Sequence, residues 1–408
     1  MTVEAPQLLR IRGLDGLAIG ALLLAAATGG VVFQEPAPFD VLMAALMAGF
    51  AVAGLHVLRA VAPLAILSGG YIVGVFIATA RTGDVGETMI HSWVTFYLAC
   101  IAIFLACVTA WSPQRSLGAI FGGTVVAALI AAIAGIVGYF ELVPGTGDLF
   151  TLFGRARGTF KDPNVFAPFL MVPLLYAASR VIAARLSAGM FWGGVCATLL
   201  FALFLSFSRG AWLNFAVAAL VFTLLVTTAL PDRRLTRRAG LFALMGVVVM
   251  ALGIVWALGS DKISDLFAER AAVTQSYDTG ATGRFAGQIK ALSVIVAEPL
   301  GIGHGEFVKH HPEQPHNVYL NTFLNAGWLG GFCYLIMVLA TFTRSVTLAL
   351  RRAPTQMMAI VLCASFTGLM IEGLFVDTDH WRHFMVVVGL IWGLGAASGN
   401  QAQLARAP

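Results

Sequence analysis

Long apolar runs separated by short polar segments dominate this sequence of 408 residues. A helix needs about 20 mostly apolar residues to cross the hydrocarbon core of a bilayer. We therefore expect an all-α, polytopic membrane protein that forms a single integral membrane domain over residues 1–408. The apolar runs predict about twelve spans, near residues 14–33, 38–58, 61–80, 91–111, 117–140, 164–180, 189–207, 210–230, 239–259, 317–342, 357–376 and 383–399.

One polar stretch, residues 260–316, interrupts this pattern. Inside it, apolar residues recur at helical spacing over a length too short to span a membrane, namely at Phe285, Ile289, Leu292 and Val296. This spacing predicts a short helix that lies in the membrane interface. Thr282 or Gly283 is expected to cap that helix, which would place Arg284 in its first turn, where a cation opposes the helix dipole.

The charge distribution indicates the orientation of the spans. Only 11% of the residues are charged, whereas soluble domains carry about 25%. The net charge of +5 comes from short basic clusters between spans, such as 231–238 and 344–352, and these clusters predict cytoplasmic segments and not nucleic-acid binding. Both termini are then expected in the cytoplasm and the 260–316 insert outside it. The five cysteines all lie in apolar runs and are expected to be inert.

Arg209 lies in a very short turn, Ser208-Arg209-Gly210, between two apolar runs. Charge at that depth is costly, so the position suggests a functional role. The planar guanidinium suits bidentate binding of phosphate oxygens. The alternative is an arginine that reaches the lipid headgroups and anchors the turn.

His316 follows Pro315 and precedes the apolar run that begins at Asn317. The helix dipole disfavours the protonated form of a histidine at a helix start, so His316 is a candidate general base. The alternative is an interfacial anchor. His304, His310 and His311 also invite a metal interpretation, but their spacing matches no zinc signature. We therefore predict no metal and no cofactor.

Two further groups are secondary candidates. Arg155, Arg157 and Lys161 precede Asp162-Pro163-Asn164 in an outward loop and would suit an anionic substrate, unless they simply face solvent. Glu372 lies within an apolar run, where a carboxylate relays protons, binds ions or pairs with an arginine of the site.

Taken together, several motifs resemble the O-antigen ligase and polymerase family of bacterial envelope glycan enzymes. The resemblance extends over roughly residues 150–340 and rests on GTFKDPNVFA (158–167), SFSRGAW (206–212), TGR (282–284), GIGHGEF (301–307), PHNVYL (315–320) and GWLG (327–330). It implies a metal-independent glycosyltransferase of the inner membrane. The glycan would move from an undecaprenyl-pyrophosphate carrier to an acceptor hydroxyl at the periplasmic face.

The resemblance assigns roles to individual residues. Arg209 and Arg284 would bind the pyrophosphate, His316 would act as the base, and Asn164 and Asn317 lie in matching motifs. The resemblance allows two acceptors: the lipid A core, if the protein is a ligase, or a growing glycan, if it is a polymerase. From another class, a transporter or flippase of a lipid-linked or anionic substrate that uses Glu372 is the alternative.

Overall fold

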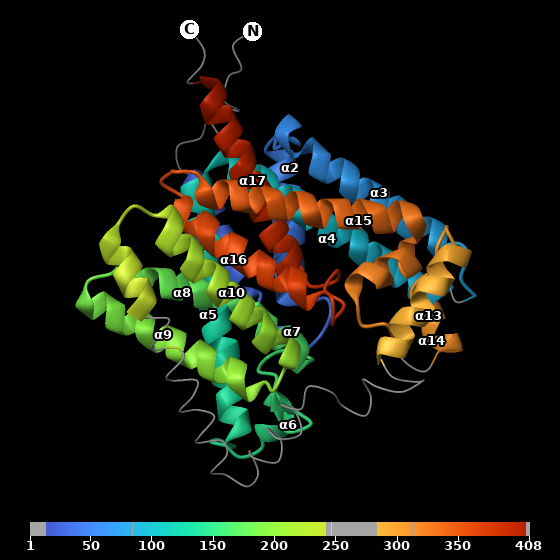
Figure 1. Cartoon of the computed structure of the whole chain (residues 1–408), viewed down its shortest axis with the longest axis horizontal. Coiled ribbons are helices and arrows are strands. Elements are labelled where there is room, and N and C mark those ends of the chain that lie inside the picture. Colours follow the sequence, from blue (N-terminus) through green and yellow to red (C-terminus); the bar gives the residue numbers. More distant parts are fainter. Residues whose placement is uncertain (1–13, 84, 242–245, 247–283, 312–313, 405–408) are drawn as a thin grey trace. The chain divides into compact units, whose positions relative to one another are not determined.

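The computed structural model describes residues 14–83, 85–241, 246, 284–311 and 314–404 (Figure 1). Within these residues nearly all regular structure is helical, and eight helical segments are long and apolar enough to cross a membrane. They are Arg59–Thr79, Val85–Trp111, Pro113–Tyr139, Pro163–Ala183, Leu186–Leu205, Arg209–Ala229, Val318–Leu350 and Arg382–Gly399. The prediction of an all-α, polytopic membrane protein is confirmed.

Three other predicted spans are shorter helices. α1 (Leu14–Thr28) and α2 (Pro38–Val52) have 15 residues each, and α16 (Gln356–Glu372) has 17. At about 1.5 Å per residue such helices are shorter than the roughly 30 Å hydrocarbon core. The predicted span 239–259 lies almost wholly outside the described residues.

The chain divides into two compact units. The first unit comprises Met1–His56, Val108–Ala271 and Ser345–Gly368, and the second comprises Val57–Cys107, Ala272–Arg344 and Leu369–Pro408. The prediction of one membrane domain over 1–408 stays a prediction.

The first unit is built around the long helix α5 (Pro113–Tyr139). α1 packs closely along it, because a Cβ on Gly123 of α5 would lie 2.3 Å from the carbonyl oxygen of Leu23. α8 (Met171–Ala183) and α9 (Leu186–Leu205) lie side by side (Figure 1). The remaining elements of this unit, besides α1, α2 and α16, are α6 (Gly147–Phe150), β1 (Thr151–Leu152), β2 (Arg155–Ala156), α7 (Pro163–Phe169), α8 (Met171–Ala183), α9 (Leu186–Leu205) and α10 (Arg209–Ala229). The strands β1 and β2 form a small antiparallel hairpin, with Leu152 opposite Arg155.

In the second unit, α3 (Ala62–Thr79) and α15 (Val318–Leu350) are in close contact. A Cβ on Gly74 would lie 2.3 Å from the carbonyl oxygen of Ala326, so only glycine allows the two backbones to approach this far. The elements of this unit, of which α4 and α15 continue past its boundaries, are η1 (Arg59–Val61), α3 (Ala62–Thr79), α4 (Val85–Trp111), α13 (Arg284–Ala297), α14 (Glu306–His310), α15 (Val318–Leu350) and α17 (Arg382–Leu404).

α15 is interrupted at Gly327, whose φ of 64° and ψ of −170° are not helical. The segment that follows α13 fills the interruption: the N–H of Trp328 donates to the carbonyl of Pro299, and that of Ile302 to the carbonyl of Leu324. Glycine permits both the positive φ and this close approach. The GWLG motif therefore attaches the segment that follows α13 to α15.

The short helix predicted within the insert is α13, which begins at Arg284. Ala291 on its inner side is buried against Phe307 and Leu324. Its apolar residues Ile289 and Val296 are 69% and 73% exposed. This exposed apolar face is what a helix lying in the membrane interface would present. The proposed caps at residues 282 and 283 lie outside the described residues.

Candidate functional site

Three of the sequence motifs fold into the N-termini of helices. Asp162 caps α7 by accepting from the N–H of Asn164, and Ser208 caps α10 by accepting from the N–H of Ala211. Asn317 precedes α15, and its side chain accepts from the N–H groups of Tyr319 and Leu320. Such caps use helix N–H groups that have no partner within the helix. Each candidate residue next to a cap is thereby set at a helix start.

Arg209 is the first residue of α10 and is half-buried. The predicted break before it is confirmed, because α9 ends at Leu205. Phe207 in this turn has a φ of 46° and is buried among Tyr139, Phe204 and Trp212. A bulky residue with positive φ is strained, so the aromatic packing fixes the turn that positions Arg209.

Asn164 connects the DPN motif (162–164) with the SFSRGAW turn (206–212) in the first unit. Its Oδ1 accepts from the guanidinium of Arg155 at 2.7 Å and from the hydroxyl of Ser208 at 3.0 Å. Arg155 is buried and also donates to the carbonyl of Ser206 at 2.8 Å. Arg155 therefore holds the SFSRGAW turn against the DPN motif.

Arg157 and Lys161, the other basic residues of this loop, contact neighbouring chain. Arg157 donates to the carbonyls of Asp148 and Lys161, at 3.0 Å and 3.4 Å. The ammonium of Lys161 lies 3.5 Å from a carboxylate oxygen of Glu35, with both side chains about half exposed, so this ion pair contributes little. Their role in binding a substrate stays a prediction.

His316 lies in the second unit, one residue before the Asn317 cap. Its φ of 45° is in the left-handed region. Nδ1 of His316 lies 3.8 Å from Oδ2 of Asp377, with the two side chains 35% and 29% exposed. Gln288 of α13 donates to the carbonyl of Pro315 at 3.2 Å, which ties α13 to the turn that carries His316.

The segment between α16 and α17, here called the 373–381 loop, supplies Asp377. It is fixed to the start of α15, because the N–H of Val318 donates to the carbonyl of Gly373 at 2.9 Å. Glu372, the last residue of α16, has no exposed surface. The sequence analysis did not single out Asp377. Residues 316 and 377 are distant in sequence, so no local pattern could have paired them.

Arg284 is the first residue of α13, as predicted. Its side chain lies outside the described residues. It belongs to the second unit with His316, Asn317 and Glu372, whereas Arg209, Arg157, Lys161 and Asn164 belong to the first unit.

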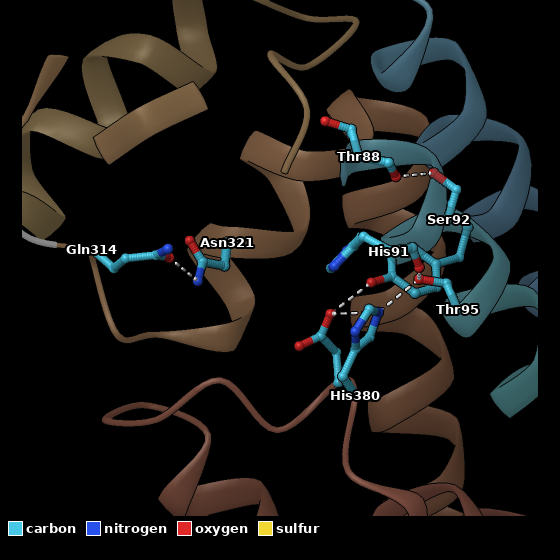
Figure 2. A network of polar contacts seen from close by, with 9 residues as sticks. Thr88, His91, Ser92, Thr95, Gln314, Asn321 and His380 are labelled. Atoms are coloured by element: carbon cyan, nitrogen blue, oxygen red, sulfur yellow. Dashed lines mark hydrogen bonds and ion pairs between the residues drawn. The ribbon is translucent and has the colours of Figure 1, made fainter. Parts of the chain in front are cut away.

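A second polar cluster of the second unit consists of His91, His304, Asp379 and His380. The ring of His91 stacks on His304 and on His380, each at 3.9 Å between centroids. The hydroxyl of Thr95 lies 2.7 Å from Nε2 of His380 (Figure 2). Burial lowers the pKa of His304, and nearby His380 lowers it further, although Asp379 and Glu87 act in the opposite direction. Sequence analysis missed this cluster, since His91 was assigned to a span.

A cavity of about 470 Å³ lies elsewhere in the second unit. Its polar lining residues are Arg81, Glu298, Glu306, His310 and His311. Arg81 donates to Glu298 at 2.8 Å and to the carbonyl of Gly301 at 2.9 Å. His310 and His311, considered above as metal ligands, thus lie at this cavity.

The fold and these residues define a multi-pass, all-α membrane protein with functional candidates at helix starts. Comparison with known families then gives the particular family: residues 194–335 match the family described as O-Antigen ligase. The matched segment includes Arg209, Arg284 and His316. This segment is therefore similar to the O-antigen ligase family, in agreement with the resemblance that the motifs indicated. Among curated proteins, none matches the chain.

Proposed function

We propose that this protein is a glycosyltransferase of the O-antigen ligase type. It transfers a glycan from an undecaprenyl-pyrophosphate carrier to an acceptor hydroxyl, either on the lipid A core or on a growing polysaccharide. The single observation that carries this proposal is the pairing of His316 with Asp377 within the second unit, at the start of α15. A histidine with a carboxylate beside one ring nitrogen is the arrangement of a general base.

The carboxylate determines which nitrogen does the chemistry. Nδ1 of His316 is the nitrogen on the side of Asp377, at 3.8 Å, so we assign the hydrogen to Nδ1 and the proton of the acceptor hydroxyl to Nε2. As that oxygen bonds to the anomeric carbon, the bond from this carbon to the pyrophosphate oxygen breaks. Asp377 stabilises the imidazolium that forms, and the proton then returns to solvent. A single displacement inverts the anomeric centre.

The leaving group gains negative charge in this step, and two arginines are assigned to it. Arg209 and Arg284 are the first residues of α10 and α13. A helix N-terminus favours an anion through its N–H groups and dipole, and a guanidinium there adds charge and bidentate hydrogen bonds. Preorganised positive charge at a developing anion is an effective source of catalysis. No metal ion is needed at the reacting atoms in this scheme.

The cellular arrangement follows from the substrates and the charge pattern. The clusters at 231–238 and 344–352 favour the cytoplasmic side. We therefore assign the protein to the bacterial inner membrane, with both termini in the cytoplasm and the 260–316 insert, including His316, in the periplasm.

The test is glycan transfer by the purified full chain, supplied with an undecaprenyl-pyrophosphate-linked glycan and an acceptor. His316→Ala should lose transfer, whereas His310→Ala, an exposed histidine of the same insert, should retain it. Full transfer by His316→Ala at wild-type protein levels would overturn the mechanism. Donor movement across vesicles without bond formation would instead favour the transporter or flippase alternative.

The acceptor that the protein uses distinguishes a ligase from a polymerase. Lipid A core offered as the acceptor gives one transfer per acceptor in a ligase. A second lipid-linked glycan gives products of increasing length in a polymerase.

A further inference from the structure

We propose that His91, Asp379 and His380 of the second unit form a binding site for a divalent transition-metal ion of the zinc class. This site lies apart from the atoms that react in the proposed transfer, and its test does not depend on that reaction. It departs from the prediction that the chain holds no metal ion, which rested on the spacing of His304, His310 and His311 and on the resemblance to a metal-independent family.

The three side chains offer ligand atoms that all lie within 4.8 Å of one another. Ligands about 2.0–2.1 Å from a tetrahedral zinc ion are separated by about 3.3 Å, so the ligand atoms must approach by about 1.5 Å at most. The rings of His91 and His380 are stacked, so one of them must also turn until both ring nitrogens point at the ion. Two imidazoles and a carboxylate are a ligand set that zinc and cobalt accept. Three protein ligands leave a fourth position for water.

The surroundings of the three residues support a ligand site. Nε2 of His91 is closed off from solvent and has no hydrogen-bond partner among the described residues. Buried polar atoms normally have a partner, and a bound ion would supply one. Asp379, which is 6% exposed, is oriented by the hydroxyl of Tyr71, which donates to its Oδ2 at 2.9 Å.

Nε2 of His380 is hydrogen-bonded to the hydroxyl of Thr95 (Figure 2), so we assign Nδ1 of His380 as its ligand atom, and the bond to Thr95 then fixes the ring from behind. Partners behind the ligands are typical of metal sites, where they orient the coordinating groups. The ring of His304, stacked on His91 with an interplanar angle of 11°, covers the other side of that ligand.

The consequence of ion binding is structural. His91 belongs to α4, whereas Asp379 and His380 belong to the 373–381 loop, which also carries Asp377. An ion held by all three would fix the loop to α4 and so limit the movement of Asp377 relative to His316. The ion is a positioning element and does not contact the glycan.

The experiment uses the full chain, purified in detergent with an affinity tag that contains no histidine. The protein is stripped with a chelator and then titrated separately with Zn²⁺ and Co²⁺. Bound metal is measured by mass spectrometry, and Co²⁺ coordination by visible absorption. We expect about one ion per chain and a tetrahedral Co²⁺ spectrum. His91→Ala and His380→Ala should weaken binding at least about tenfold, and Tyr71→Phe about tenfold.

The matched control is His310→Ala, which removes an exposed histidine outside the cluster and should leave binding unchanged. Equal metal content in the wild type and in a His91→Ala/His380→Ala double variant would overturn the site. If the double variant does not fold, the Co²⁺ spectrum of the wild type tests the site instead. An octahedral spectrum, as hydrated Co²⁺ gives, would refute the proposed site.

Discussion

Oδ2 of Asp377 lies 3.8 Å from Nδ1 of His316, although the two residues are far apart in the sequence. His316 precedes α15 with a left-handed φ of 45°, and Asp377 follows α16. A non-glycine residue in that region costs about 1 kcal/mol or more, so the surrounding contacts must hold it. The hydrogen bonds from Val318 to Gly373 and from Gln288 to Pro315 are such contacts.

This pairing predicts that Asp377→Asn lowers transfer while the protein stays folded. The amide keeps the size of the side chain but removes the charge that stabilises the imidazolium. We expect kcat to fall by about 10²–10⁴-fold, the usual contribution of general acid–base catalysis, with a small change in KM. Steady-state transfer assays on purified protein measure this.

Glu306→Gln is the control for that substitution, because it neutralises a carboxylate of the same unit whose partner is Lys309. It should leave kcat unchanged. Asp377→Asn with wild-type kcat would mean that Asp377 does not assist His316.

Arg209 provides a prediction about the leaving group. Arg209→Ala should lower kcat/KM by about 10²–10³-fold, as expected when one preorganised group at a developing anion is lost. Arg209→Lys should recover only part of this, because an ammonium keeps the charge but lacks the bidentate fork. Transfer assays with varied donor concentration measure both effects.

Arg352→Ala is the matched control, since Arg352 is an exposed arginine of the 344–352 cluster. It should behave as the wild type. Equal loss in Arg209→Ala and Arg352→Ala would indicate a general dependence on positive charge and not a pyrophosphate site.

Hydropathy predicted most of the helices, because a long apolar run in a membrane protein satisfies its backbone hydrogen bonds by forming a helix. The break at Ser208-Arg209-Gly210 and the short helix at Arg284–Ala297 both follow from local sequence. The lengths of α1, α2 and α16 were not predicted correctly, because these helices are shorter than the predicted spans. Apolar residues continue past their ends, and hydropathy does not show where the backbone turns. α2, for example, is followed by Gly54, with a φ of 89°.

Non-local pairs could not be read from the sequence. His91 looked like one polar residue in a span, and Asp379 and His380 looked like loop residues. Their proximity depends on how α4 packs against the 373–381 loop. Arg155 shows the reverse case: in sequence it belongs to a basic loop cluster, but in the structure it is buried and bonded to Ser206 and Asn164.

Asn164 is therefore expected to matter for stability. Asn164→Ala leaves the buried guanidinium of Arg155 and the hydroxyl of Ser208 without this acceptor, which should lower the free energy of unfolding by about 1–3 kcal/mol. Asn164→Asp keeps an acceptor for both donors and should cost less. Thermal unfolding in detergent compares the two variants, and an equal loss of stability in both would contradict this role.

The glycines of α3 allow a test of helix packing within the second unit. A Cβ on Gly74 would lie 2.3 Å from the carbonyl oxygen of Ala326 and 2.8 Å from the backbone nitrogen of Gly330, both of which are backbone atoms that cannot rotate away. Gly74→Ala must therefore push α3 and α15 apart, and we expect the free energy of unfolding to fall by about 1–3 kcal/mol.

Gly69, in the same helix, has no atom within 4 Å of an added Cβ. Gly69→Ala should leave stability unchanged or raise it by up to about 1 kcal/mol, because alanine favours the helix. Thermal unfolding should thus show a loss of stability for Gly74→Ala and none for Gly69→Ala. A similar change in both would mean that helix propensity, and not the contact with Ala326, decides the outcome.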